Sequence, residues 1–436
     1  MSNAEIDAIA TVGSTAYVER AEAPSVRAAC DILSPPLWVW SDPEGQTRVG
    51  AGSAKRIVAE GETRFGAIGD SIGTLTAGLG DVPGGPGAFI GARFFPTTRG
   101  EAIGWSDFPS AIATVPSLQL TWNDDITATI SVYSTIGSQD ASHRLADLLD
   151  RFERRDPPRQ SLPAVVNQRY EPSPADWRAG IETALERLHR PPLEKVVLAG
   201  TSVLDLDAPP SIGSLVEALI ERHPDCWVYA YAPNRSTIFI GATPERLATM
   251  SGDRLETVAL AGSIKRGETL TGDDQLADVL LDRERGRHEQ ANVVGDIVKR
   301  LGPITEVIRV DSRRIRRLTD VQHIESPISA RLRQGTGLLE VTSRLHPTPA
   351  VGGRPRASAL ATIAEIEMIE RGWYAAPIGF VEPDGTGTLA VGIRSARIDG
   401  STATLFAGNG IVPESDPSDE WDELVLKFRA IGGVFG

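Results

Sequence analysis

Residues 406–427 read FAGNGIVPESDPSDEWDELVLK and join an apolar strand pattern, a glycine-rich segment and a helical pattern in one run. The last part, EWDELVLK (420–427), predicts a helix with Glu420, Glu423 and Lys427 at positions i, i+3 and i+7. These three charged side chains lie next to an apolar stripe that a soluble protein buries. Two carboxylates and a lysine at the edge of a buried face require an explanation.

A second helical pattern supplies a third carboxylate. Within the predicted long helix 276–301, Val293 and Ile297 belong to the apolar stripe, and Glu289 extends that row by one turn. A carboxylate in line with buried positions is costly unless it is paired or binds a cation. We therefore expect Glu289 and the Glu420/Glu423 pair to face one site, with oxygen ligands of the kind that Mg²⁺ prefers. The alternative for each glutamate is a solvated helix edge.

Composition limits the class of protein. The chain has 436 residues, a net charge of −14, and only two cysteines, Cys30 and Cys226. Two cysteines exclude a disulfide framework or a thiolate metal site. The negative charge argues against nucleic acid or an anionic membrane as partner. No run of eighteen apolar residues occurs, and the first residues carry acids where a signal peptide needs basic ones, so we expect a cytoplasmic protein.

The pattern of elements predicts a mixed α/β fold with large, mostly antiparallel sheets. Residues 1–160 show short strand patterns between turns, and 151–168 read as a connection to a second region, 165–436. That region opens with a helix capped by Ser173 or Asp176. Strands and helices then alternate, and GTLAVGIRSARI (387–398) reads as one strand. The glycines of GTGTLA (385–390) and GNGIVP (408–413) are interpreted as hairpin or loop glycines, because no third glycine completes a dinucleotide fingerprint.

Eight motifs occur in the order found in chorismate-utilising enzymes, which include isochorismate, salicylate, anthranilate and aminodeoxychorismate synthases. The resemblance covers residues 165–436, and the N-terminal part resembles the variable half of menaquinone-type isochorismate synthases. It implies an α+β fold with two large, mostly antiparallel sheets packed face to face and helices outside. The motifs are KVVLA, GATPERL, LAGSIKRG, RHE, LHPTPAVGG, RGWYAAPIGF, IRSARI and the opening stretch.

The resemblance implies a reaction in which chorismate loses its C4 hydroxyl and gains water at C2. By position in EKVVLA, Lys195 matches the general base, and Glu245 in GATPERL matches the general acid. Ammonia-using relatives replace this lysine, so its presence favours water as the nucleophile. A lysine base requires a depressed pKa, and a glutamic acid that donates a proton requires a raised one.

The same resemblance assigns the metal and the substrate contacts. Glu289 and Glu423 match direct Mg²⁺ ligands, Glu420 matches a residue that holds metal-bound waters, and Lys427 is expected to point to the ring carboxylate of chorismate. Arg394 and Tyr374 match the pair that binds the enolpyruvyl carboxylate. The remaining residues expected to line the substrate pocket are Gly262, Ser263, His323, Ala350 and Gly408, with a packing role as the alternative for His323.

Two departures from the family pattern stand out. Gly286 replaces an acidic residue three positions before Glu289, which removes one carboxylate near the metal. The strand that begins at Lys195 continues as Ala199-Gly200, where many relatives have an arginine as the second residue, so an ion pair there is in doubt.

Four functions stay open at this point. Isochorismate synthase leads. A salicylate synthase would add pyruvate elimination, but such relatives tend to carry threonine where this chain has Ala350. Lys195 disfavours an anthranilate or aminodeoxychorismate synthase, so no glutamine amidotransferase subunit is expected. A catalytically silent chorismate-binding protein is suggested only by Gly286. The pathway that uses the product is undecided among menaquinone, catechol siderophores and salicylate-derived compounds.

Overall fold

The structure is a computed structural model that describes residues 10–12, 15–20, 23–76, 79, 86–97, 104–122, 127–134, 137–154, 158–282, 284–317 and 321–435. Two residues of interest, Ser263 and Glu289, have described backbones, but their side chains lie outside the described part.

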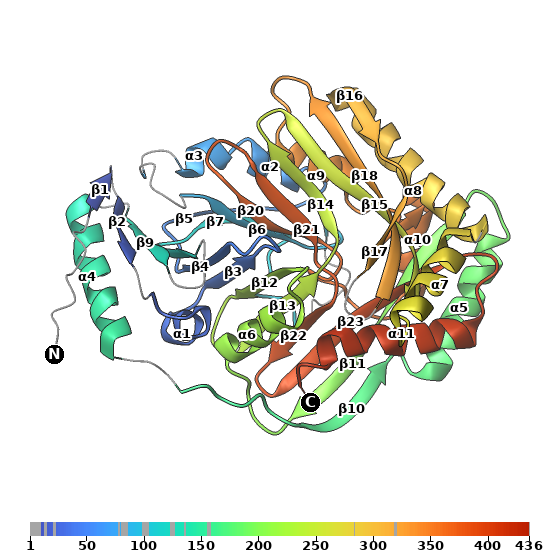
Figure 1. The fold of residues 1–436 in the computed structure, drawn as a ribbon, viewed down its shortest axis with the longest axis horizontal. Coiled ribbons are helices and arrows are strands. Elements are labelled where there is room, and N and C mark those ends of the chain that lie inside the picture. The colour runs from blue at the N-terminus through green and yellow to red at the C-terminus, as the bar shows by residue number, and fades with distance from the viewer. Residues whose placement is uncertain are drawn as a thin grey trace.

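Two antiparallel sheets form the centre of the molecule (Figure 1). The larger has 13 strands in the described part of the chain and combines N-terminal and C-terminal segments. In spatial order its strands are β1 (Ala10–Val12), β2 (Thr15–Arg20), β9 (Ala128–Tyr133), β8 (Leu118–Trp122), β4 (Thr47–Ala51), β3 (Leu37–Ser41), β12 (Trp227–Ala232), β13 (Thr237–Thr243), β22 (Ser395–Asp399), β23 (Thr402–Ile411), β11 (Lys195–Leu206) and β10 (Val165–Glu171), with β19 (Gly353–Arg354) paired to β11.

The second sheet has 10 strands among the described residues and also draws on both halves of the sequence. Its order is β16 (Thr305–Val310), β18 (Val321–Leu332), β15 (Arg254–Lys265), β14 (Arg246–Ser251), β21 (Gly387–Val391), β20 (Pro377–Val381), β6 (Ala88–Ala92), β7 (Ala111–Val115) and β5 (Lys55–Ala59), with β17 (Arg314–Arg317) paired to β18.

Helices lie outside the two sheets (Figure 1). They are α1 (Val26–Ile32), α2 (Arg64–Gly69), α3 (Ile72–Thr76), α4 (Ser138–Arg154), α5 (Pro174–Leu188), α6 (Ile212–Arg222), α7 (Leu270–Asp282), α8 (Glu284–Leu301), α9 (Leu338–Leu345), α10 (Arg356–Ile366) and α11 (Pro417–Gly432), with the 3₁₀ turn η1 (Gly302–Ile304) after α8. None of the helices in the described ranges is both long and apolar enough to cross a membrane.

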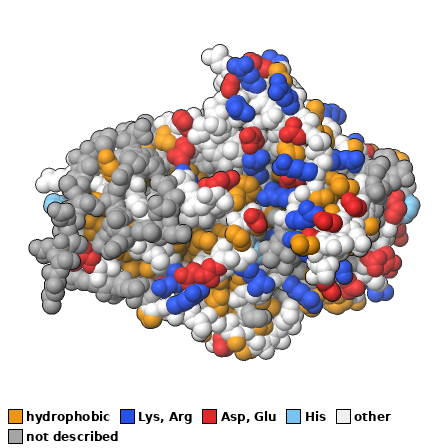
Figure 2. All heavy atoms as spheres, in the orientation of Figure 1, with side chains coloured by type: hydrophobic (Ala, Val, Ile, Leu, Met, Phe, Trp, Pro, Cys, Tyr) orange, Lys and Arg blue, Asp and Glu red, His pale blue; other side chains and the backbone are white. Residues whose placement is uncertain are grey.

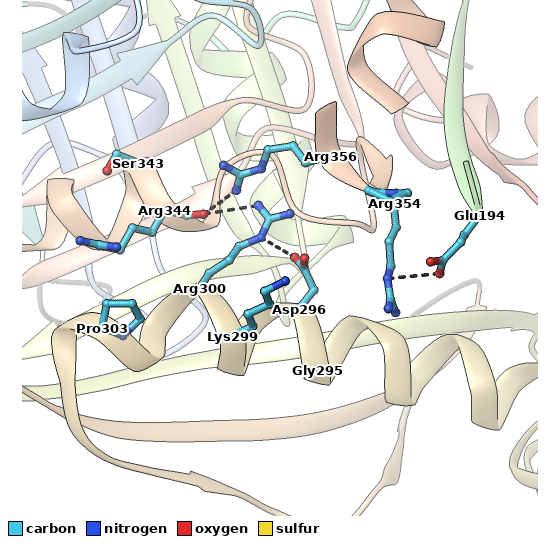
Figure 3. Close-up of a pocket in the computed structure, with 11 residues that line it drawn as sticks. Glu194, Gly295, Asp296, Lys299, Arg300, Pro303, Ser343, Arg344, Arg354 and Arg356 are labelled. Atoms are coloured by element: carbon cyan, nitrogen blue, oxygen red, sulfur yellow. Dashed lines mark hydrogen bonds and ion pairs between the residues drawn. The ribbon is translucent and has the colours of Figure 1, made fainter. Parts of the chain in front are cut away.

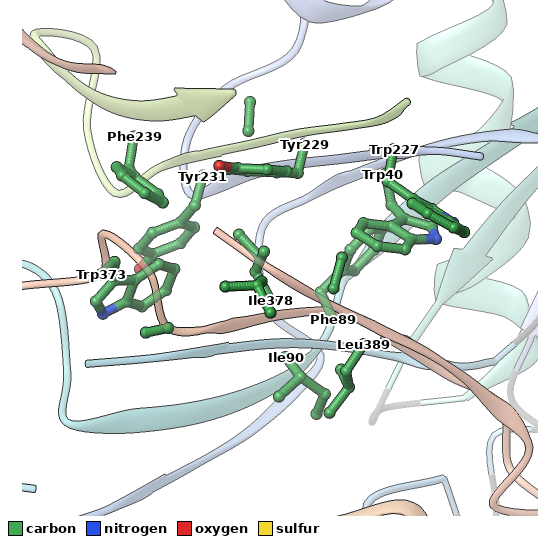
Figure 4. Packing of buried hydrophobic residues seen from close by; sticks show 14 of the residues in the cluster. Trp40, Phe89, Ile90, Trp227, Tyr229, Tyr231, Phe239, Trp373, Ile378 and Leu389 are labelled. Carbon is green, nitrogen blue, oxygen red and sulfur yellow. The ribbon is translucent and has the colours of Figure 1, made fainter. Parts of the chain in front are cut away.

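Aromatic side chains fill the space between the sheets (Figure 4). Trp38 of β3 stacks on Phe89 of β6 with ring centroids 5.7 Å apart, and so joins one sheet to the other. Trp373 stacks on Tyr231 of β12 at 5.0 Å. Rings of this size remove a large apolar area from water, so face-to-face packing follows from their placement on the inner faces of both sheets.

The structure confirms the predicted fold class and most predicted elements. Helix α5 is capped by Ser173, whose side chain accepts a hydrogen bond from the backbone of Asp176. The predicted helix 276–301 corresponds to α7 and α8, between which only residue 283 lies outside the described part, and both bury apolar residues, Leu280 and Val293 among them.

Two strand interpretations required correction. Residues 387–398 form β21 and β22, which belong to different sheets, so the chain leaves one sheet and enters the other at residues 392–394. Both glycines of GNGIVP lie in β23, which continues to Ile411, so their interpretation as hairpin or loop glycines was wrong. The glycines of GTGTLA do lie in a hairpin, between β20 and β21.

Candidate active site

Glu245 and Arg394 lie where the chain crosses between the two sheets. One crossing joins β13 to β14, and the other joins β21 to β22. The crossings are hydrogen-bonded to each other: the Val391 N–H donates to the Glu245 carbonyl (2.9 Å), and the Ala242 N–H donates to the Arg394 carbonyl (3.2 Å). Arg394 has a φ of 49°, which is rare for a residue with a side chain. The fold therefore brings two charged side chains, distant in sequence, to one place.

The Glu245 carboxyl is buried, with only 8% of the residue exposed. Its backbone N–H donates to Thr243 Oγ1 (3.1 Å), and Thr348 Oγ1 donates to its Oε1 at 3.5 Å. Burial raises the pKa of Glu245 from its usual 4.5 to about 7, and the charges of Lys195 and Arg394 and the Thr348 hydrogen bond oppose that rise. The carboxyl is thus protonated in a substantial fraction of molecules at neutral pH, as a proton donor must be.

Lys195 begins β11 and extends across Gly410 of β23. A Cβ atom at position 410 would lie 2.5 Å from Lys195 Cε and 3.0 Å from its Nζ. On the same face of β23, a Cβ at Gly408 would lie 3.0 Å from the Tyr374 hydroxyl. Glycine occurs twice in this strand because Lys195 and the buried Tyr374 fill the space where side chains would project.

Tyr374 is buried at this site, and His323 is partly buried. The Tyr374 ring stacks on Phe406 at 5.4 Å, and burial raises the pKa of its hydroxyl. His323 on β18 has its pKa lowered to about 3, chiefly by burial and then by the charge of Arg394, so its imidazole is neutral at physiological pH. A hydrogen bond with the Gly262 backbone counteracts this shift. Gly262 has a φ of 68° at a bulge in β15, a conformation that favours glycine.

Helix α11 presents its charged edge to β23. Asp416 caps the helix by accepting hydrogen bonds from the N–H groups of Ser418 (2.8 Å) and Asp419 (3.2 Å). Glu420 is 8% exposed, and burial followed by the nearby Glu423 raises its pKa, against hydrogen bonds from Ser415 and Asn409 and the charge of Lys427. A cation beside this carboxylate would offset the cost of burying it.

The Lys427 ammonium group contacts three partners within the protein. Its Nζ donates to the Gly408 carbonyl (2.9 Å) and to Asn409 Oδ1 (3.0 Å), and it pairs with Glu423 Oε1 (2.8 Å). An ammonium group has three N–H donors. A contact between Lys427 and a substrate carboxylate therefore requires that one of these partners be released.

The structure gives less detail for three of the predicted site residues, Glu289, Ser263 and Ala350. Glu289 lies in α8 and Ser263 in β15, opposite His323, but their side chains are outside the described residues. Ala350 lies in the loop after α9 and is half-buried. The neighbouring Val351 is held by hydrogen bonds to Thr348 and from Arg371.

Comparison with known proteins identifies the family of the chain. The family model described as chorismate binding enzyme matches residues 15–436.

The chain belongs to the chorismate-binding enzyme family.

Two relatives and two solved structures illustrate the likeness. The chain is 36% identical over 356 residues to isochorismate synthase MenF of Bacillus subtilis, covering 81% of this chain and 75% of the relative. It is 33% identical over 411 residues to the salicylate biosynthesis isochorismate synthase of Pseudomonas aeruginosa, covering 92% and 85%.

The solved structures support the fold. The menaquinone-specific isochorismate synthase MenF from Escherichia coli has a TM-score of 0.83 at 23% identity, covering 99% of this chain and 97% of that one. Anthranilate synthase component I from Streptococcus pneumoniae has a TM-score of 0.72 at 18% identity, covering 99% and 95%. The chorismate-binding fold is thus shared with enzymes of different activities.

A buried ion pair behind the site was not predicted from the sequence. Arg371 donates from Nε and Nη2 to the two oxygens of Glu367 (both 2.7 Å), and each side chain is 1% exposed. Arg371 also donates to the Val197 carbonyl (2.7 Å), and Glu367 accepts from the Ala199 N–H (2.9 Å). The pair therefore clamps β11 two to four residues from Lys195. Residues 367–371 follow α10 and are not helical, so helical spacing could not have indicated the pair.

Asn409, which the sequence did not single out, and Gly200, where many relatives have an arginine, both lie next to α11. The Asn409 amide donates to Glu420 Oε2 (3.0 Å) and accepts from Lys427, so it joins β23 to α11. A Cβ at Gly200 would lie 3.2 Å from Leu424 Cδ2 of α11. A side chain at this position would require Leu424 to shift by a few tenths of an ångström.

Replacing Glu245 with glutamine should change how stability depends on pH. Because the pKa of Glu245 is raised in the folded protein, the protonated carboxyl contributes to the free energy of unfolding. This contribution is complete below about pH 4.5 and is lost as pH rises through about 7. We expect Glu245→Gln to gain stability over the unmodified protein across this interval, by up to about 3 kcal/mol at 1.36 kcal/mol per pKa unit. Chemical denaturation at several pH values measures this. Glu182→Gln, at an exposed position of α5, is the control, and a pH-independent gain would contradict the assignment.

Replacing Gly410 with alanine should displace Lys195. The new methyl group would occupy the space of the lysine Cε, so we expect kcat to fall at least about tenfold with a small change in KM. Steady-state kinetics with chorismate measure both constants. Gly66→Ala in α2, where a Cβ meets no atom within 4 Å, is the matched control. Unchanged kcat in a folded Gly410→Ala variant would show that Lys195 is not seated there for catalysis.

Proposed function

We propose that this chorismate-binding enzyme is an isochorismate synthase, which adds water at C2 of chorismate and removes the C4 hydroxyl. The observation that carries the proposal is the buried Glu245, with a pKa of about 7, within electrostatic reach of Lys195. Relatives at 30–36% identity named isochorismate synthase support the same function. A protonated carboxyl and a lysine are the acid and base that this exchange of hydroxyl groups needs.

Lys195 is the general base in this proposal. Its ammonium end is held over Gly410, at the start of the strand that the Glu367–Arg371 pair clamps. In its neutral form the amine takes a proton from the water that attacks C2. Glu245 donates its proton to the C4 hydroxyl, which leaves as water, so one proton enters and one leaves the protein in each turnover.

Positive charge and backbone groups bind the two carboxylates of chorismate. Arg394 lies at the crossing next to Glu245, and its bidentate donors suit the enolpyruvyl carboxylate, with the Tyr374 hydroxyl beside Gly408 as the second contact. Neutral His323, Gly262, Ser263 and Ala350 line the pocket in this proposal. Lys427 holds Glu423 and β23 in position. It reaches the ring carboxylate of chorismate only if it releases one of its contacts within the protein.

The residues on α11 fit a Mg²⁺ ion. Burial and Glu423 both raise the pKa of Glu420. A cation bound beside Glu420 would stabilise the ionised form of this carboxylate. Glu289 and Glu423 would be ligands, and Glu420 would orient metal-bound water through its hydrogen bond with Asn409. When bound, Mg²⁺ supplies positive charge that neutralises the substrate and enzyme carboxylates.

Product analysis tests the proposed function. Incubation of the purified protein with chorismate and Mg²⁺ should yield a mixture of chorismate and isochorismate, identified by chromatography and mass. Lys195→Ala should lower kcat by roughly 10²–10⁴, as expected for a lost proton-transfer group. Added ammonia should yield no amino product with the unmodified enzyme. An aminated product, or no turnover of chorismate, would overturn the proposal.

Metal removal tests the role of α11. We expect EDTA to abolish turnover and added Mg²⁺ to restore it. Glu423→Gln removes one ligand charge and should lower activity by orders of magnitude, with a weaker apparent affinity for Mg²⁺. The exposed Asp422→Asn, on the same helix, should leave Mg²⁺ affinity near that of the unmodified enzyme. Full activity in EDTA would exclude a metal requirement.

Ala350 should determine where the reaction stops. Its methyl side chain cannot hydrogen-bond the enolpyruvyl group in the conformation needed for pyruvate elimination. We expect little pyruvate from the unmodified enzyme and more from Ala350→Thr, in a coupled pyruvate assay. Ala350→Val adds similar bulk without a hydroxyl and should not raise pyruvate release. Stoichiometric pyruvate from the unmodified enzyme at neutral pH would make it a salicylate synthase.

A further inference from the structure

A cavity of about 720 Å³ opens between α8, α9 and the start of α10 (Figure 3). It is distinct from the candidate active site, because Lys195, Glu245 and Arg394 do not line it. Its lining residues are Glu194, Gly295, Asp296, Lys299, Arg300, Pro303, Ser343, Arg344, Arg354, Pro355 and Arg356. Five of these are basic and two are acidic.

The acidic side chains neutralise only part of this charge. Asp296 pairs with Arg300 (2.6 Å), and Glu194 pairs with Arg354 (3.2 Å). Arg344 pairs with Glu340, which does not line the cavity. For Lys299 and Arg356 no carboxylate of the described residues lies within ion-pair distance.

The arginines are held in place by backbone groups. Arg300 Nη1 donates to the carbonyls of Leu345 (3.4 Å) and Pro347 (3.2 Å), and the Arg356 guanidinium donates to the Arg344 carbonyl. Arg356 Nε is buried, and no hydrogen-bond acceptor for it exists among the described residues. A buried donor without an acceptor is uncommon in folded proteins. Guanidinium groups fixed in this way lose little conformational freedom when an anion binds.

We propose that this cavity binds a small dianion that carries phosphate or carboxylate groups. Its volume is in the range of small-molecule sites. The chain as a whole carries a net charge of −14, and acidic and basic side chains are interspersed over the face in Figure 2. A concave site with net positive charge in such a protein concentrates anions locally. The proposal is independent of the reaction that the active site performs.

The cavity adjoins the strand that carries the catalytic lysine. Arg354 of β19 lies opposite Lys195 of β11, and the Glu194 N–H donates to the Arg354 carbonyl (2.9 Å). A bound anion would contact Arg354 and Arg300, and so both β19 and the loop that leads to Ala350. Binding should therefore slow amide exchange in residues 194–200 and 345–356.

Isothermal titration with inorganic phosphate and with succinate, at ionic strength kept constant with sodium chloride, tests the proposal. We expect saturable 1:1 binding of at least one of them. Lys299→Ala and Arg356→Gln should each weaken it at least fivefold. Tighter binding of phosphate would indicate a phosphorylated ligand, and tighter binding of succinate a dicarboxylate. The proposal would be overturned if neither anion saturated the protein, or if both variants kept the affinity of the unmodified protein.

Two controls separate the cavity from general charge effects. Arg313→Ala removes an exposed positive charge that does not line the cavity and should leave anion affinity unchanged. Lys299 is exposed and lies outside the active site, so Lys299→Ala should keep the basal turnover of chorismate. Hydrogen exchange with and without the bound anion then locates the site. Slower amide exchange only in segments other than 194–200 and 345–356 would also contradict the proposal.

Discussion

The ion pair between Glu367 and Arg371 connects three segments on which the site depends. Arg371 contacts the carbonyls of Val197 and Val351, and Glu367 contacts the N–H of Ala199. The pair thus fixes the strand that begins at Lys195 and the loop that carries Ala350. Tyr374 follows on the same segment, and its N–H donates to the Arg371 carbonyl (2.8 Å). A buried pair is stable only if its remaining donors and acceptors are satisfied, and here backbone groups of β11 and of the loop that carries Ala350 satisfy them.

The two crossings between sheets complete the arrangement. Because the chain changes sheets once near Glu245 and once near Arg394, the acid and the arginine meet at the boundary of the two sheets. Lys195 approaches this boundary across Gly410, which has no side chain to exclude it. Burial at this boundary also raises the pKa of Glu245, so one feature of the fold gives both the position and the protonation state of the acid.

Much of the fold could be predicted from the sequence, and the exceptions have physical causes. Short apolar runs predicted β11, β12 and β13, and the cap at Ser173 predicted α5. The sequence of 387–398 is typical of one continuous strand. The pattern of apolar residues does not indicate which sheet a residue joins, so it does not predict the break between β21 and β22 at residues 392–394. The glycines of β23 were assigned to a loop because their cause is the approach of Lys195 and Tyr374, which are distant in sequence. The family resemblance named Lys195, Glu245 and Arg394, whereas the clamp of Glu367 and Arg371 and the link through Asn409 became evident only from contacts.

The most direct measurement compares kcat and stability in a double variant, Glu367→Met with Arg371→Met. Removing both charges together leaves no unpaired buried charge, so the fold should retain most of its stability. If the pair positions β11 and Lys195, kcat for chorismate should fall at least about tenfold while the melting temperature changes little. A folded double variant with the kcat of the unmodified enzyme would contradict this account, because the pair would then contribute to packing alone.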